Sequence, residues 1–260
     1  MKLWLRLTGV LVVLLLVLAG VIAFLPARWA QSAIETRLHG LRLAGVGGSV
    51  WNGHADSVID SQGVALGRVD WQLSRRLLLG HLEATIDFDG PKIGFKGHME
   101  RISDTAQHWS DVHVRFDLSQ ASADAATGMR PSGVLEADIG NALLQGQWPT
   151  QLNGTGRWRE AAMITRQGSV ALGTLRWEAQ AQNGLIQGTV NDLGDQGPLK
   201  LSGVFAASAL GWRYSLDATP RGSQPALRRW LASLGPVDAE GSLHLEYKGG
   251  LASMSHKEKP

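Results

Sequence analysis

The sequence resembles itself at an offset of about 106 residues, and this repetition constrains the fold more than any other feature. The segment LGRVDW at residues 66–71 returns as LGTLRW at residues 172–177, and Trp51 is matched by Trp158 at an offset of 107. Two further matches keep the same order along the chain: GPKIGFKG (90–97) with GPLKLSG (197–203), and SGVLEADI (132–139) with EGSLHLEY (240–247). Four ordered matches at nearly one offset indicate an internal duplication.

The repeated segments alternate between apolar and polar residues, which is typical of half-buried antiparallel strands. VALGRVDWQLS (64–74) and VHVRFDL (112–118) both show this period of two. We therefore expect a mainly β domain built from two tandem units, β-repeat 1 at residues 46–140 and β-repeat 2 at residues 153–248.

Each predicted β-repeat carries two tryptophans about 20 residues apart. We expect them to form the structural core of the repeats, since one indole buries roughly 150 to 250 Å²: Trp51, Trp71, Trp158 and Trp177. Tight hairpin turns are predicted at Asn52-Gly53, Asn183-Gly184 and Asp89-Gly90.

One helix is predicted inside β-repeat 2, at SQPALRRWLASLG (223–235). Its apolar stripe is Ala226, Leu227, Trp230 and Leu234. The segment opens with Ser223 as N-cap and ends in Gly235. The corresponding SQASADAATG (119–128) predicts a shorter, weaker helix.

The amino-terminal part predicts a single membrane span. Residues 7–25 form an apolar run without charge, about 28 Å long as a helix, which matches a bilayer core of about 30 Å. Lys2 and Arg6 are expected to hold the tail, residues 1–6, in the cytoplasm, and Arg28 and Trp29 are expected at the outer interface. A cleaved signal peptide is the alternative, but its apolar core would be shorter.

Two further segments complete the predicted organisation. Residues 27–42 show helical spacing of apolar residues and predict a juxtamembrane helix. Residues 249–260 lack apolar periodicity and predict a flexible tail.

The chemistry of the chain argues against catalysis. The net charge of +2 gives no reason to expect nucleic-acid binding, and the absence of cysteine excludes thiol catalysis and thiolate metal sites. No nucleophile elbow, phosphate loop, dinucleotide fingerprint or zinc helix occurs. His108 and His113, five residues apart on a predicted strand, are expected on opposite faces, so no metal site is predicted. No catalytic residue and no cofactor are predicted.

The combination of one span with GGSVWNGHA (47–55), LGRVDWQL (66–73), GRWREAAM (156–163) and LGTLRWEA (172–179) resembles protein N of the bacterial type II secretion system, the GspN family. The resemblance implies a bitopic inner-membrane protein with a periplasmic β-domain, which assists export of folded proteins across the outer membrane. It implies the inner-membrane platform subunits, and possibly the outer-membrane secretin, as partners, with lipid contacted through the anchor. The family supplies no catalytic residues.

A second interpretation stays open on the residues alone. Tandem β-units can curl into a groove with an apolar interior, a layout similar to AsmA-type periplasmic proteins that carry lipid or another apolar ligand. An open apolar face would favour a carrier, whereas an apolar face closed by an opposing layer would favour a scaffold.

Overall fold

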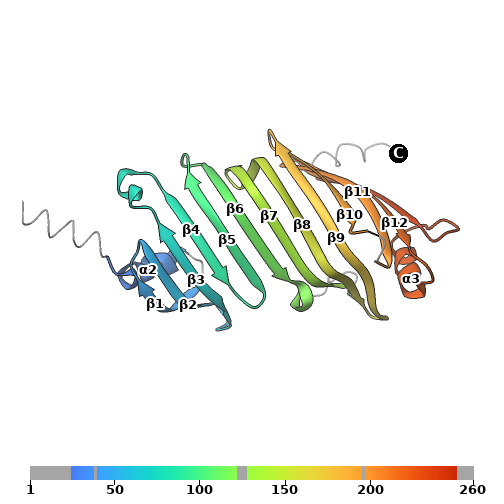
Figure 1. The fold of residues 1–260 in the computed structure, drawn as a ribbon, viewed down its shortest axis with the longest axis horizontal. Coiled ribbons are helices and arrows are strands. Elements are labelled where there is room, and N and C mark those ends of the chain that lie inside the picture. The colour runs from blue at the N-terminus through green and yellow to red at the C-terminus, as the bar shows by residue number, and fades with distance from the viewer. Residues whose placement is uncertain (1–24, 38–39, 122–127, 195–196, 251–260) are drawn as a thin grey trace, which may run out of the picture. The chain divides into compact units, whose positions relative to one another are not determined.

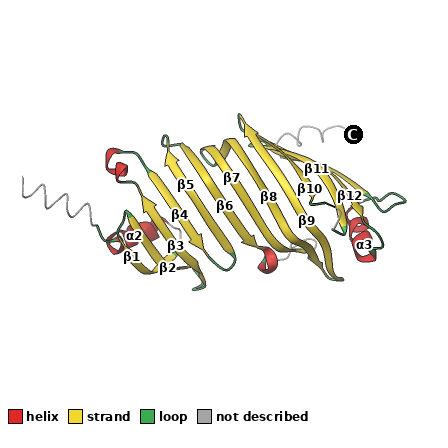
Figure 2. Cartoon of the chain, in the orientation of Figure 1, coloured by secondary structure: helices red, strands yellow, loops and turns green. Residues whose placement is uncertain are grey.

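The fold is mainly β, as the alternation predicts, and every strand pairing between the described residues is antiparallel (Figures 1 and 2). The computed structural model describes residues 25–37, 40–121, 128–194 and 197–250. The chain divides at Gly90 into two compact units, unit 1 (residues 1–90) and unit 2 (residues 91–260).

Unit 1 contains four strands that follow one another in the sheet in chain order. They are β1 (Arg42–Gly48), β2 (Asn52–Ile59), β3 (Ala65–Leu73) and β4 (Glu83–Asp89). Helix α2 (Ala27–Arg37) precedes them, and the short helix η1 (Arg75–Leu79) joins β3 to β4.

Unit 2 contains nine described strands, again in chain order. They are β5 (Ile93–Arg101), β6 (Ala106–Asp117), β7 (Arg130–Gln145), β8 (Trp148–Thr165), β9 (Gly168–Gln182), β10 (Leu185–Asp192), β11 (Leu199–Ser208), β12 (Gly211–Pro220) and β13 (Leu243–Gly250). The short helix η2 (Leu118–Gln120) follows β6, and helix α3 (Pro225–Leu234) lies between β12 and β13.

Helix α2 is fastened to β1 through polar side chains. Gln31 Nε2 donates to the Leu43 carbonyl at 2.8 Å, and the Leu43 N–H donates to Glu35 Oε1 at 2.8 Å. The hydrogen bond from Gln31, followed by that from the Leu43 N–H, lowers the pKa of Glu35. Leu43 itself belongs to the buried core of unit 1, together with Ala55 and Val58. The helix is therefore an integral part of unit 1.

The first described residues are also joined to the sheet. The Val50 N–H donates to the Leu25 carbonyl at 2.9 Å, Pro26 pairs with Ser49 as an isolated bridge, and Ala27 is 1% exposed. The helix ends at Arg37, and Arg42 already begins β1, so the predicted helix over 27–42 is too long at its carboxyl end.

The core of unit 2 forms where α3 packs on the sheet. Leu227 and Leu231 are 2% and 1% exposed and contact Leu175, Leu199 and Leu243. Burying one leucine side chain contributes about 1.5 to 3 kcal/mol. The predicted helix is confirmed, but its N-cap is Gln224 without a side-chain cap bond, and not Ser223.

Of the three predicted turns, the one at Asn52-Gly53 is wrong and the one at Asn183-Gly184 is confirmed, while Asp89 of the third is the last residue of β4. Asn52 and Gly53 lie at the start of β2, where Gly53 pairs with Trp71 of β3. Asn183 and Gly184 connect β9 to β10 with φ values of 51° and 78°, which is the left-handed geometry of a two-residue hairpin turn.

Several predicted segments lie outside the described residues. These are the tail 1–6, residues 7–24 of the predicted span, residues 122–127 of the weaker helix, and residues 251–260 of the tail. Across the ranges that the structure does describe, no helix has the length and apolar character needed to span a membrane.

Candidate interaction surface

The sheet of unit 2 has one apolar face and one polar face. Register pairs Trp177 with Val190, Phe205 with Tyr214, and Tyr214 with Tyr247, so these side chains share one side across β9 to β13. We call this side the apolar face. The intervening residues, such as Glu178 and Thr189, form the polar face. The alternation of the sequence thus continues across five neighbouring strands.

Large side chains on the apolar face lie over glycines of the adjacent strand. A Cβ atom built on Gly156 would overlap the ring of Trp177, and one built on Gly188 would overlap the ring of Phe205. In unit 1, a Cβ atom on Gly53 would lie 2.6 Å from Trp71 Cζ2. These rings therefore cover backbone directly, which explains how the tryptophans are half-buried without an opposing strand layer.

Helix α3 covers one end of the apolar face, and aromatic residues occupy the other end. Around α3 the face is closed by Leu227 and Leu231. At the far end, Trp212 and Tyr247 stack with ring centroids 4.7 Å apart, and both remain about half exposed, at 48% and 49%. Tyr214 stacks on both rings. A stacked, exposed aromatic group is typical of a contact surface.

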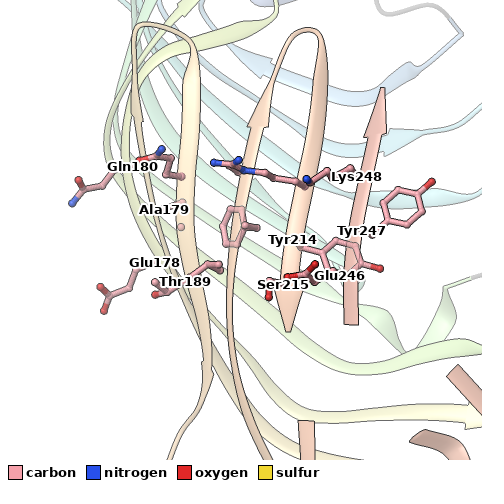
Figure 3. Close-up of a pocket in the computed structure, with 15 residues that line it drawn as sticks. Glu178, Ala179, Gln180, Thr189, Tyr214, Ser215, Glu246, Tyr247 and Lys248 are labelled. Atoms are coloured by element: carbon pink, nitrogen blue, oxygen red, sulfur yellow. The ribbon is translucent and has the colours of Figure 1, made fainter. Parts of the chain in front are cut away.

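The polar face carries a concavity of about 690 Å³ over β9 to β13 (Figure 3). Its lining includes Glu178, Gln187, Arg213, Ser215, Glu246 and Lys248. Figure 3 shows the side chains of Tyr247 and Lys248 leaving β13 on opposite sides, which places them on the apolar and polar faces respectively.

Several charged residues of unit 2 are paired. Arg176 binds Glu178 and Arg159 binds Glu136, each with an N–O distance of 2.6 Å. Exposed pairs of this kind contribute about 0 to 1 kcal/mol each.

Arg221 forms a more enclosed contact between strands. It donates to Asp192 Oδ2 at 2.7 Å and to the Leu199 carbonyl at 2.9 Å. Burial alone would raise the pKa of Asp192, but hydrogen bonds from Arg221 and the Leu201 N–H outweigh it, so the pKa lies below its usual value. The geometry is that of a structural clip.

Two histidine–aspartate pairs cross neighbouring strands. His113 Nδ1 lies 2.5 Å from Asp138 Oδ1, and His244 Nδ1 lies 2.7 Å from Asp217 Oδ1. We assign both to cross-strand pairing.

The prediction that His108 and His113 lie on opposite faces of the sheet is wrong. The pairing of β5 with β6 shifts register opposite Gly97, because Asp111, with φ at 52°, adds one residue to β6. Such a bulge reverses the alternation beyond it, so His108 and His113 lie on the same face. Glu100 pairs with His108, and Lys96 pairs with His113. Among the described residues, no cluster has the composition of a metal site.

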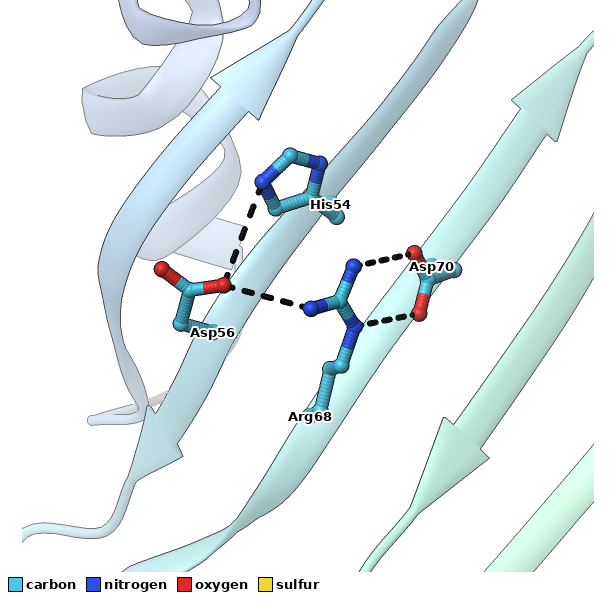
Figure 4. A network of polar contacts seen from close by, with 4 residues as sticks. All are labelled: His54, Asp56, Arg68 and Asp70. Carbon is cyan, nitrogen blue, oxygen red and sulfur yellow. Dashed lines mark hydrogen bonds and ion pairs between the residues drawn. The ribbon is translucent and has the colours of Figure 1, made fainter.

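Unit 1 carries an exposed charge network on β2 and β3 (Figure 4). Arg68 donates to both oxygens of Asp70, at 2.9 and 3.0 Å, and its third nitrogen lies 3.4 Å from Asp56. His54 Nε2 lies 3.9 Å from the same Asp56 oxygen. The hydrogen bond between Arg68 and Asp70 raises the pKa of the arginine and lowers that of the aspartate.

The four predicted core tryptophans occupy different surroundings. Trp51 is 8% exposed, whereas Trp71 is half-buried and donates to the Val50 carbonyl at 3.1 Å. Trp158 is half-buried beside the α3 core and donates to the Ser132 carbonyl at 3.0 Å. Trp177 is half-buried over Gly156.

The residues predicted at the membrane interface are only partly described. Arg28 and Trp29 lie in α2 and are exposed, Trp29 at 70%. Lys2 and Arg6 precede the first described residue.

Sequence reasoning missed the glycines beneath the rings and the aromatic group of Trp212, Tyr214 and Tyr247. The signal for the first was present, because Gly156 and Gly188 occupy apolar-side positions in alternating strands. The second needs the β12–β13 register, because Tyr247 lies 33 residues beyond Tyr214 in the chain.

Comparison with known proteins identifies the family of this chain. The family model described as "Type II secretion system (T2SS), protein N" matches residues 39–246. The type II secretion system protein N of Vibrio cholerae serotype O1 is 29% identical over 177 residues, which cover 65% of this chain and 68% of the relative. No solved structure matches the chain.

Proposed function

The chain belongs to the protein N family of the type II secretion system, and from this premise we propose that it is a non-enzymatic scaffold subunit in protein export. One observation carries the proposal beyond family membership. Helix α3 covers one end of the apolar face of unit 2, and the stacked aromatic side chains at the other end stay about half exposed. Such a face offers partner subunits a large contact area at low entropic cost.

We propose further that residues 7–25 anchor the protein in the bacterial inner membrane, with the sheet in the periplasm. The hydrogen bond between Leu25 and Val50 supports a direct connection from anchor to sheet, because no free linker separates residue 25 from unit 1. The burial of Ala27 supports the same arrangement. Partner subunits would then meet the sheet at a fixed height above the bilayer.

The pairing register supports the internal duplication. In β2 and β3 the pairs are Gly53–Trp71, Ala55–Val69 and Val58–Gly67. In β8 and β9 the pairs are Gly156–Trp177, Trp158–Leu175 and Ala161–Gly173. Both ladders shift register at the same step, before Gly67 in one and before Gly173 in the other. We therefore propose that β2 to β7 and β8 to β13 derive from one six-stranded unit.

This register changes one of the sequence matches. It aligns Trp71 with Trp177, as the sequence does, but it aligns Trp158 with Ala55 and not with Trp51. Equivalent residues of β2 and β8, such as Gly53 and Gly156, are 103 positions apart. Equivalent residues of β3 and β9, such as Trp71 and Trp177, are 106 positions apart.

Photo-crosslinking in cells tests the scaffold. A photoreactive amino acid at Val190, on the apolar face, is expected to crosslink platform or secretin subunits, whereas the same probe at Thr189, on the polar face, serves as the matched control. Equal crosslinking from both positions, or undiminished secretion after deletion of the gene, would contradict the scaffold role.

A second experiment tests the anchor. Replacing residues 1–24 with a cleavable signal peptide keeps the contacts of Leu25 and α2, so the released protein should fold. We expect secretion to fail, because the sheet is no longer held at the membrane. Normal secretion by the released protein would exclude a tethered role.

A lipid or apolar-ligand carrier remains the second candidate, and the open part of the apolar face is the observation that favours it. The concavity of about 690 Å³ gives the carrier less support, because charged side chains line it. Lipid extraction from the released protein, purified without detergent, distinguishes the two. A stoichiometric bound lipid would support the carrier, and its absence would support the scaffold.

A further inference from the structure

At one end of the unit 2 sheet, the turns and strand ends of β7 to β13 lack negative charge. We call this part the turn end; it comprises residues 145–148, 182–185, 208–213 and 247–250 and contains no aspartate or glutamate. The β5–β6 turn beside it carries Asp104, since the Gly146 N–H donates to the Thr105 carbonyl at 2.7 Å. Three hairpin turns and the last residues of β13 meet there, since Gln145 pairs with Trp148, Gln182 with Leu185, and Gly211 with both Ser208 and Gly250.

Exposed apolar side chains project from the turn end. Leu210 is 65% exposed, Trp212 48% and Leu185 43%. Trp148 lies beside them and donates its indole N–H to the Gly184 carbonyl at 2.7 Å. Leucines at turn tips beside tryptophan and tyrosine are the composition found at membrane–water interfaces.

Two cations lie directly opposite one another at the same end. Arg213 of β12 pairs in register with Lys248 of β13. Like charges in this position repel, so a ladder normally places an opposite charge there. No carboxylate among the described residues lies within ion-pair distance of either side chain. The nearest acidic residue along β13, Glu246, lies 3.5 Å from His244 instead.

The cations and the apolar side chains share one hollow. A concavity of about 510 Å³ is lined by Leu185, Leu210, Trp212, Arg213 and Lys248 together. Arg213 and Lys248 also border the larger concavity of the polar face. A ligand at this position therefore meets two positive charges beside apolar surface.

We propose that the turn end binds the surface of a phospholipid membrane that contains anionic lipids. Leu210, Leu185 and Trp212 enter the interfacial layer, and Arg213 and Lys248 bind headgroup phosphates. Charge complementarity selects this partner, because phosphate neutralises Arg213 and Lys248, and the residues of the turn end itself carry no carboxylate that would repel it. This contact is separate from the predicted anchor and goes beyond the scaffold role.

The full chain allows a direct test, because its lack of cysteine permits a single label. Ala209→Cys carries an environment-sensitive fluorophore at the turn end, and Ser223→Cys carries it at the exposed start of α3 as the control. The labelled protein is held in phosphatidylcholine nanodiscs. Spin-labelled quencher lipids are placed either in the nanodisc or in added vesicles of phosphatidylcholine with or without phosphatidylglycerol.

We expect quenching and a blue shift at position 209, stronger with phosphatidylglycerol, and neither at position 223. Arg213→Gln with Lys248→Gln should weaken binding to the anionic membrane by about fivefold per charge removed, with little change for phosphatidylcholine alone. Leu210→Ser should weaken both. Quenching at neither position, equal quenching at both positions, or a blue shift that requires another secretion subunit would overturn the proposal.

Discussion

The indole of Trp177 on β9 lies against Gly156, its cross-strand partner on β8. The ring takes the space that any side chain at position 156 would need. This pairing stabilises a single-layered sheet, because aromatic area leaves water without a second layer of strands.

Replacing Gly156 should therefore destabilise unit 2. Gly156→Val forces the Trp177 ring off the sheet and also approaches the Glu136 carbonyl. We expect a loss of about 1 to 3 kcal/mol in the free energy of unfolding, the usual cost of overpacking. Urea unfolding followed by tryptophan fluorescence measures it.

Gly140→Ala is the matched control, because a Cβ atom there meets no atom within 4 Å. Its unfolding midpoint should change little. An equal loss at both positions would mean that glycine matters for strand flexibility and not for the ring contact.

The duplication makes a paired prediction for Gly67 and Gly173. Both have positive φ, 149° and 96°, and both face a second glycine: a Cβ atom would lie 2.5 Å from Gly90 Cα in one case and 3.1 Å from Gly197 Cα in the other. Alanine at either position should cost about 1 kcal/mol or more, through strain and close approach. Gly168→Ala, with positive φ but open space, isolates the strain. If alanine at only one of these two positions left the free energy of unfolding unchanged, Gly67 and Gly173 would not be equivalent.

Leu231 should be the most sensitive residue of α3. It is 1% exposed, so Leu231→Ala leaves a cavity and should cost about 2 to 5 kcal/mol in thermal or urea unfolding. Leu234→Ala, on the same helix at 37% exposure, should cost under about 1 kcal/mol. Similar losses would show that α3 packs on the sheet differently.

Stability should depend on pH through His244. The hydrogen bond with Asp217 and the contact with Glu246 raise the pKa of His244 above its usual 6.5. The protonated ring is thus favoured in the fold, and its stabilisation is fully present below about pH 6.5 and lost as pH rises through the folded pKa. Nuclear magnetic resonance titration of the imidazole measures this pKa.

The variant Asp217→Asn removes the main cause of this shift and should lower the His244 pKa. Asp138→Asn, which faces His113 instead, should leave it unchanged. A His244 pKa that does not respond to Asp217→Asn would contradict the assignment.

The sequence alone determined the mainly β fold, helix α3 and the Asn183–Gly184 turn. Each depends on local rules: alternation sets which side of a strand is apolar, helical spacing sets the stripe of Leu227, and only certain residues accept the turn geometry. The family resemblance was also readable, because ordered short motifs survive in the linear chain.

Only the tertiary structure decided which residues of neighbouring strands lie opposite one another and which face of the sheet each side chain occupies. The bulge at Asp111 brings His108 and His113 to one face, and no local sequence pattern predicts this added residue. The opposition of Arg213 and Lys248, 35 positions apart in the chain, likewise depends on the register between β12 and β13. Register is fixed by the packing of whole strands against their neighbours, so it is a property of the assembled sheet and not of any segment.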